Sequence, residues 1–201
     1  MIKREDLGRY DFVMLIDKSG SMETRDCGKN RNISRWNYAK EQTKAFAEVC
    51  ASFDDDGIDI ILFSNRVKSY EGVTPEKVDQ IFVENSAGGT TDTALAVQKA
   101  FDSYRDRGMK KPMIVVCVTD GIPDDQRELK DVIIGITKKI KSDDDFGILF
   151  LQVGYDRSAT AFLDELDNNL SGAKFDVVST VNAEDSADFS IVELLLKSIN
   201  E

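Results

Sequence analysis

Runs of consecutive apolar residues alternate along the chain with segments whose apolar residues recur at helical spacing. A continuous apolar run predicts a buried strand, and apolar residues three and four positions apart predict a helix that packs by one face. The predicted strands are 11–16, 58–63, 67–70, 113–119, 146–153 and 175–179. The predicted helices are 35–52, 75–81, a segment through 94–104, a segment through 129–140, a segment through 162–170, and 185–199.

The alternation of strands with helices favours a mostly parallel sheet with helices on both faces. One pair of strands must be antiparallel, because the three residues Ser64-Asn65-Arg66 are too few for a parallel crossover. We therefore predict an α/β fold with a six-stranded, mostly parallel sheet and one short antiparallel edge strand. No repeat, low-complexity tract or linker interrupts the chain, which favours a single domain over residues 1–201.

Local polar signals mark several ends of these elements. Ser34 is predicted to cap the helix over 35–52, and Asp125 with Glu128 to form a capping box for a later helix. The run Asp54-Asp55-Asp56-Gly57 is interpreted as a solvated turn. It lacks the spaced acidic ligands and the closing glutamate of a calcium loop.

The residue types that are missing exclude several kinds of chemistry. The chain has no histidine, which excludes a Ser-His-Asp triad, a Cys-His pair and a His-ligated zinc site. Cys27, Cys50 and Cys117 are an odd number without a Cys-x-x-Cys pair, which argues against a disulfide framework and a thiolate metal site. Cys117 is expected to be buried in its strand. Cys27 lies in a polar stretch and is expected to be the reactive one.

The charge of the chain narrows the range of partners. With 26 Lys and Arg against 37 Asp and Glu, the net charge is −11. Repulsion from phosphates argues against nucleic acid and against an anionic membrane as partners. The N-terminal residues do not form a signal peptide, and no apolar run approaches the length of a membrane span. We therefore expect a cytoplasmic location.

The candidate chemistry lies directly after the first strand. Asp17, Ser19 and Ser21 present one carboxylate and two hydroxyls at alternating positions around Gly20. Ligands of open α/β sheets gather at the carboxyl ends of the strands. Oxygen ligands with few charges suit Mg²⁺, which keeps some of its water in proteins.

Two later segments extend this pattern into a family resemblance. Gly88-Gly89-Thr90-Thr91 opens a predicted helix, and Asp120 follows the strand 113–119 and precedes Gly121. Together with Asp-x-Ser-x-Ser, these loops resemble the metal-ion-dependent adhesion site (MIDAS) of von Willebrand factor type A (VWA) domains. The resemblance implies a Rossmann-like three-layer α/β/α fold over essentially the whole chain. It also implies that Ser19, Ser21 and Thr90 ligate Mg²⁺, with Mn²⁺ or Ca²⁺ as alternatives, and that Asp17 and Asp120 act directly or through water.

The sequence leaves open which of the two adjacent threonines is the ligand, so Thr91 is the alternative to Thr90. The resemblance further implies a binding module in which a carboxylate of a partner protein completes the coordination of the ion. Similar stand-alone bacterial domains work beside AAA+ ATPases or in stress-response assemblies, which is the expectation for the partner. The loop from Met22 to Asn32 carries Arg25, Lys29 and Arg31 and could contact an acidic partner, or it could be a solvated loop.

Two other functions compete with metal-dependent binding. The chain could be a scaffold that keeps the motif and binds partners through another surface. It could also be a Mg²⁺-dependent phosphoryl-transfer enzyme, because an aspartate after a strand occurs in such folds. In haloacid-dehalogenase-like phosphatases an acid stands two residues after that aspartate, where this chain has Ser19. No phosphate-binding glycine loop is present either, so we expect no enzyme activity.

Overall fold

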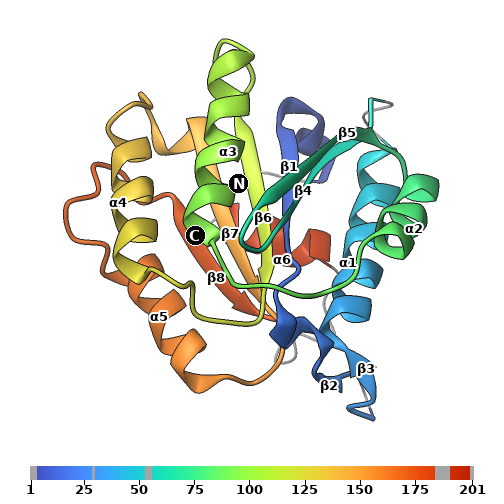
Figure 1. Ribbon diagram of the computed structural model, residues 1–201. Helices are drawn as coiled ribbons and strands as arrows, with labels where there is room; N and C mark the ends of the chain where they lie inside the picture. The colour runs from blue at the N-terminus through green and yellow to red at the C-terminus, as the bar shows by residue number, and fades with distance from the viewer. Residues whose placement is uncertain (1–3, 29, 53–55, 184–190, 200–201) are drawn as a thin grey trace.

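The computed structural model describes residues 4–28, 30–52, 56–183 and 191–199, and its centre is one six-stranded sheet (Figure 1). The order of strands across the sheet is β5-β4-β1-β6-β7-β8. These strands are β1 (Asp11–Asp17), β4 (Ile58–Phe63), β5 (Val67–Val73), β6 (Met113–Thr119), β7 (Phe146–Gln152) and β8 (Val178–Asn182). All neighbouring strands pair in parallel except β4 and β5, which are antiparallel. The predicted α/β fold with one antiparallel edge strand is confirmed.

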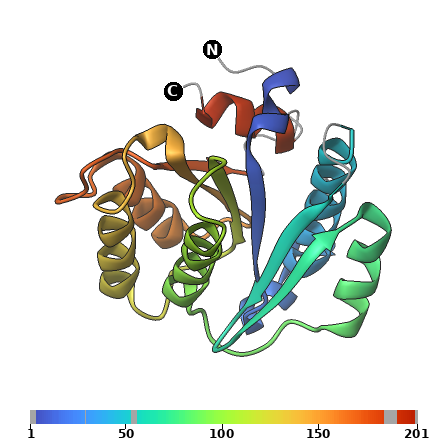
Figure 2. The same cartoon turned by 90° about the horizontal axis from the view of Figure 1, so that it is seen from above.

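Helices cover both faces of this sheet, in three layers (Figure 2). One face packs against α1 (Arg35–Cys50), α2 (Pro75–Glu84) and α6 (Ile191–Ile199). The other face packs against α3 (Thr93–Asp106), α4 (Gln126–Thr137) and α5 (Arg157–Asn168). Three short 3-10 helices, η1 (Arg4–Arg9), η2 (Gly20–Glu23) and η3 (Asp143–Asp145), complete the described elements.

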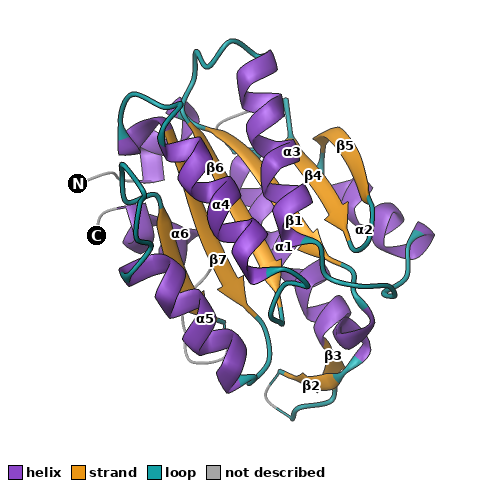
Figure 3. Ribbon diagram, turned by 60° about the vertical axis from the view of Figure 1, so that its left-hand side comes forward, coloured by secondary structure: helices purple, strands orange, loops and turns teal. Residues whose placement is uncertain are grey.

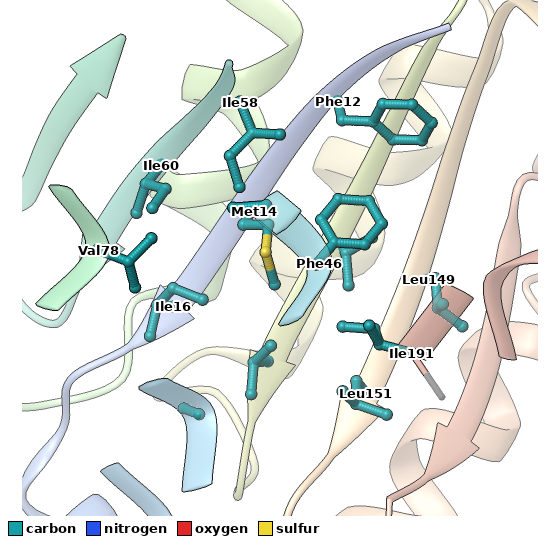
Figure 4. Packing of buried hydrophobic residues seen from close by; sticks show 14 of the residues in the cluster. Phe12, Met14, Ile16, Phe46, Ile58, Ile60, Val78, Leu149, Leu151 and Ile191 are labelled. Atoms are coloured by element: carbon teal, nitrogen blue, oxygen red, sulfur yellow. The ribbon is translucent and has the colours of Figure 1, made fainter. Parts of the chain in front are cut away.

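Side chains of β1 alternate between these two cores, because successive residues of a strand point to opposite faces. Met14 and Ile16 pack with the α1 side, while Val13 and Leu15 pack with the α3 side, and all four are buried. Figure 4 shows the first core, where the ring of Phe12 meets the ring of Phe46 edge to face at 5.3 Å between centroids. Burial on both faces fixes β1 as the central strand that carries Asp17 to the sheet edge.

Side-chain caps begin the helices where the sequence indicates. Ser34 accepts a hydrogen bond from the backbone N–H of Asn37 (3.2 Å), and Asp125 accepts one from that of Glu128 (2.8 Å). Both capping residues were predicted from the sequence. None of the helices among the described residues is long and apolar enough to cross a membrane.

Three local expectations are wrong. The sixth strand of the sheet spans Val178–Asn182, three residues later than the predicted 175–179. The segment expected to be a loop contains a hairpin, β2 (Arg25–Cys27) paired with β3 (Ile33–Ser34), set apart from the main sheet in Figure 3. Cys27 is not a reactive surface thiol, because this hairpin buries it completely in the core.

Other expectations agree with the structure or fall on residues that it leaves undescribed. Cys117 is buried in β6 as predicted, and burial raises the pKa of its thiol well above the usual value. The aspartate turn over 54–57 lies partly outside the described residues, as does the first part of the helix predicted over 185–199. Its described part is α6.

Candidate metal centre

The candidate site lies where the chain changes direction across the sheet. From β1 the next strands lie on one side (β4, then β5), and the later strands lie on the other (β6, β7, β8). Loops after β1 and β6 therefore diverge at the carboxyl edge, which is where open α/β sheets bind ligands. Asp17 ends β1, and Asp120 directly follows β6, so the topology brings two of the predicted site residues together.

Asp17 is fully buried and is held through both carboxylate oxygens. Its Oδ1 accepts the backbone N–H of Ser19 at 2.7 Å, and its Oδ2 accepts the hydroxyl of Thr119 at 2.7 Å. These two bonds fix the carboxylate against the first turn of the loop and against the end of β6. Its orientation is therefore set by the fold rather than by solvent.

The two serine hydroxyls form a directed chain that ends on Asp120. Ser21 Oγ donates to Asp120 Oδ1 at 2.9 Å, and Ser19 Oγ lies 3.0 Å from Ser21 Oγ. A hydroxyl has one proton to donate. Because Ser21 donates its proton to Asp120, it accepts the hydrogen bond from the hydroxyl of Ser19. Ser19 is buried and Ser21 is exposed, so the chain runs from the interior toward the surface.

Asp120 is also buried, and its second oxygen faces an arginine. Arg35 Nη1 donates to Asp120 Oδ2 at 2.7 Å, and the same guanidinium forms two bonds to Asp26 of β2, at 2.9 and 2.6 Å. The side chain of Arg35 is 12% exposed, and that of Asp120 is 1% exposed. The Arg35 guanidinium lowers the pKa of Asp26.

The glycine-threonine loop lies against the first loop through its backbone. Gly89 O accepts the N–H of Gly20 at 3.1 Å, and the N–H of Gly88 donates to Lys18 O at 2.5 Å. Gly89 has a φ of 97°, and a Cβ there would lie 3.1 Å from Ser64 Oγ. This contact leaves little room for a side chain, so glycine at position 89 permits the close approach of this loop to Ser64, which follows β4.

The two candidate threonines differ in their surroundings. Thr90 is exposed, whereas Thr91 is 9% exposed. The backbone of Thr91 exchanges two bonds with Asp124: its N–H donates to Asp124 Oδ2 (3.0 Å), and its carbonyl accepts the N–H of Asp124 (2.9 Å). Neither threonine caps the next helix, because Asp92 is the N-cap of α3 and accepts the N–H of Leu95 at 2.9 Å.

The charges of this cluster suit a divalent cation. Asp17, Asp26 and Asp120 are three carboxylates, and among the described residues Arg35 is the cation whose side chain bonds to two of them, Asp26 and Asp120. One positive charge against three negative charges leaves an excess of two negative charges. Burial, followed by the negative charge of Asp120, raises the pKa of Asp17 to about 6. The hydrogen bonds from Ser19 and Thr119 act in the opposite direction and lower it. A buried carboxylate that is hard to ionise lacks a positive neighbour.

The spacing of the hydroxyl oxygens also suits a small cation. Mg²⁺ binds oxygens at about 2.0–2.1 Å in an octahedron, so neighbouring ligand oxygens lie roughly 3 Å apart. The two serine oxygens are 3.0 Å apart. Among the described residues no three or more His, Cys, Asp or Glu side chains gather as a metal site. A cation here would therefore depend on the hydroxyls as well as on the carboxylates.

Three residues of this network were not found from the sequence, namely Thr119, Asp26 and Arg35. Two of their bonds join distant parts of the chain: Arg35 lies 85 residues from Asp120, and Thr119 lies 102 residues from Asp17. One signal was available: Arg35 is the first residue of α1, which has no acidic residue in its first turn. A cation is unfavourable at the positive end of a helix dipole, so an arginine there indicates carboxylates nearby.

Comparisons with known proteins agree with this architecture. The sequence profile of the von Willebrand factor type A domain family matches residues 12–122. The search of curated proteins found no match. Among solved structures, the chain is similar to the manganese-loaded TRAP protein of Plasmodium vivax, with a TM-score of 0.59 and 14% identity over 93% of this chain and 72% of that one.

Two further structures are similar at the level of the fold. A von Willebrand factor type A protein from Catenulispora acidiphila has a TM-score of 0.64 and 16% identity, over 92% of this chain and 42% of that one. A mutant of the PilB minor pilin from Streptococcus sanguinis has a TM-score of 0.65 and 14% identity, over 94% of this chain and 62% of that one. The chain thus spans less than two thirds of the length of either of these two proteins.

Proposed function

The chain belongs to the von Willebrand factor type A domain family, and on that premise we propose that it is a metal-dependent protein-binding module. Domains of this family commonly mediate protein–protein interactions. The observation that carries the proposal is the excess of two negative charges in the cluster of Asp17, Asp26, Asp120 and Arg35, next to two hydroxyls 3.0 Å apart; Asp17 and Asp120 of this cluster are buried. A divalent cation would balance that charge.

In this proposal Ser19, Ser21 and one threonine would ligate the ion, and Asp17 and Asp120 would act on it directly or through water. When bound, the ion supplies an electrophilic position for an external carboxylate. Ser21 is already oriented for this role, because its proton points to Asp120 and the lone pair that does not face Ser19 remains available. Mg²⁺ fits the spacing of the oxygens, and the manganese in the TRAP structure supports a divalent ion of similar preference.

For the threonine we favour Thr91, although the sequence favoured Thr90. The two backbone bonds to Asp124 hold Thr91 beside the loop that carries Asp120, and its side chain is nearly buried. Thr90 remains the alternative, as an exposed residue next to the glycine pair.

We propose that the partner is a protein that presents an Asp or Glu carboxylate, such as a component of an AAA+ ATPase-associated or stress-response assembly. The rim of the site supports an acidic partner. Arg25 and Arg31 are exposed on the β2–β3 hairpin, and the guanidinium carbon of Arg31 lies 4.5 Å from the ring centroid of Tyr155. We further propose a cytoplasmic location, because an odd number of cysteines without a Cys-x-x-Cys pair argues against a disulfide framework.

Capture of partners from a cell lysate, with and without chelator, tests this function. The double variant Ser19→Ala, Ser21→Ala should lose Mg²⁺ binding in isothermal titration and also lose partner capture. Its fold should persist, because the apolar core of β1 is untouched. Ser69→Ala with Ser158→Ala, two exposed serines on β5 and α5, is the matched control and should behave as the wild type.

A folded Ser19→Ala, Ser21→Ala protein that loses the ion and still captures its partner at wild-type strength would favour the scaffold function instead. We also propose that the domain is not an enzyme. Phosphatase, nucleotidase and protease activities should stay at background, and a turnover that Asp17→Asn abolishes would reverse that proposal.

A further inference from the structure

Arg35 is held in place more firmly than a surface arginine. Two parallel bonds join its guanidinium to Asp26, and the backbone N–H of Arg35 donates to Thr24 O at 3.0 Å. A Cβ on Gly154, which follows β7, would lie 2.5 Å from Arg35 Nε. The guanidinium thus fills a space that Gly154 leaves open, and paired bonds to a carboxylate fix its plane as well as its position.

The third contact of this guanidinium points into the candidate metal centre. Arg35 Nη1 binds Asp120 Oδ2, while Ser21 binds Asp120 Oδ1. Both oxygens of Asp120 are therefore engaged by donors of the chain itself. Each oxygen still has a second lone pair, but turning the carboxylate to face a cation would break its bond to Arg35, which Asp26 holds in place.

On the basis of the proposed metal-dependent function, we propose that Arg35 is a positioning residue for Asp120. It keeps Asp120 behind Ser21, out of direct contact with a bound cation, and it offsets part of the charge of that carboxylate. The site therefore holds its ion less tightly than two free carboxylates would. In exchange, more of the positive charge of the ion remains for a partner's carboxylate, since a neutralised aspartate attracts the ion less.

Titration of Mg²⁺ into Arg35→Gln is the first test. The variant should bind Mg²⁺ roughly tenfold more tightly than the wild type, because the positive charge beside Asp120 is gone and the carboxylate is free to ligate. Arg107→Gln is the matched control. Arg107 also contacts two aspartates, Asp11 and Asp59, but at the opposite edge of the sheet, so its loss should leave the affinity unchanged.

A count of bound water separates positioning from a merely structural role. With Mn²⁺ as the probe, the water-proton relaxation enhancement reports the exchangeable waters on the ion. Arg35→Gln should lose about one such water relative to the wild type, as expected if Asp120 enters the coordination shell. An unchanged water count in a folded variant would overturn the proposal.

A double-mutant cycle tests whether Arg35 acts through Asp120. In an Asp120→Asn background, Arg35→Gln should no longer tighten Mg²⁺ binding. If Arg35→Gln does not fold by circular dichroism, Arg35→Lys replaces it. A lysine keeps the charge but cannot hold both aspartates, so Mg²⁺ binding should tighten by less than tenfold, and unchanged affinity would overturn the proposal.

The outcomes separate this inference from the function on which it rests. If the wild type binds Mg²⁺ and a folded Arg35→Gln binds it equally or more weakly, only the positioning role fails. The same holds if the effect persists in the Asp120→Asn background. If the wild type itself shows no Mg²⁺ binding, the proposed function fails and the positioning role fails with it.

Discussion

Two arginines of this protein each bridge two aspartates, at opposite edges of the same sheet. At the carboxyl edge Arg35 joins Asp26 and Asp120, with side-chain exposures of 12%, 25% and 1%. At the amino edge Arg107 joins Asp11 and Asp59, with exposures of 41%, 23% and 15%. The amino-edge cluster also contains a second cation, because Lys111 Nζ lies 3.0 Å from Asp11 Oδ1, and water screens this cluster more than the first.

This difference in burial supports the carboxyl-edge cluster, and not the amino-edge cluster, as the candidate metal site. The amino-edge cluster ties the end of α3 to the starts of β1 and β4, and its charges can be solvated. The carboxyl-edge cluster is more deeply buried and lies beside another buried carboxylate, that of Asp17. Uncompensated charge in the interior is costly, which supports the proposal that a cation binds at this cluster.

The largest expected difference between the two edges concerns metal binding. Strand β1 begins with Asp11 and ends with Asp17, which gives a matched pair of variants. Asp17→Ala should lose all detectable Mg²⁺ binding in isothermal titration, whereas Asp11→Ala should keep the wild-type isotherm. An unchanged isotherm for Asp17→Ala would show that the ion, if there is one, binds elsewhere.

The second difference concerns stability without metal. In chelator, Arg35→Gln should lower the free energy of unfolding by about 3 kcal/mol, because it leaves Asp120 buried and unpaired. Arg107→Gln should cost at most about 1 kcal/mol, since its partners can be hydrated. Urea unfolding of both variants at pH 7 measures the two costs, and equal costs would remove the contrast between the edges.

A third effect separates Asp17 from ordinary carboxylates. Its pKa is raised from 3.8 to about 6, so between about pH 4 and pH 6 the folded state binds more protons than the unfolded state. The free energy of unfolding in chelator should therefore fall as the pH rises through this window, by about 3 kcal/mol in all. Subtracting the same curve for Asp17→Asn isolates this contribution. A difference that rises with pH would contradict the raised pKa.

The smallest effect separates two neighbours within the carboxyl edge. Thr91→Ala should weaken Mg²⁺ binding by roughly tenfold, as the loss of one neutral ligand, and Thr90→Ala should change it little. Both substitutions leave Asp92 as the cap of α3, so helix stability is matched between them. The reverse ranking would place the ligand at Thr90, as the sequence favoured.

Much of the fold could be predicted because the apolar runs are long and unambiguous. The strands 58–63 and 113–119 were predicted with the bounds that the structure has, and β1 was predicted one residue short. The last strand was placed too early because Phe175 and Val177 are apolar and precede it; Phe175 packs against the core without joining the sheet. The β2–β3 hairpin was missed because its strands have only three and two residues, which is too short to show the alternation of apolar and polar residues typical of a strand.

The candidate site also contains residues that could be predicted from the sequence and residues that could not. Loop chemistry after a strand is local, so the sequence could predict that Asp17, Ser19, Ser21 and Asp120 would meet. The structure brings these four together. The Arg35 contacts depend on the path of the hairpin and on the space at Gly154, and neither follows from a single sequence.

The central place of β1 in the sheet has a kinetic consequence. Ser21 and Asp120 are 99 residues apart in the chain, and Asp17 and Thr119 are 102 apart, so the site exists only after β1 has paired with β6. Such long-range pairing is slow, and it is formed late on the way to the native state. A cation that binds only the finished site should slow unfolding and leave the folding rate nearly unchanged.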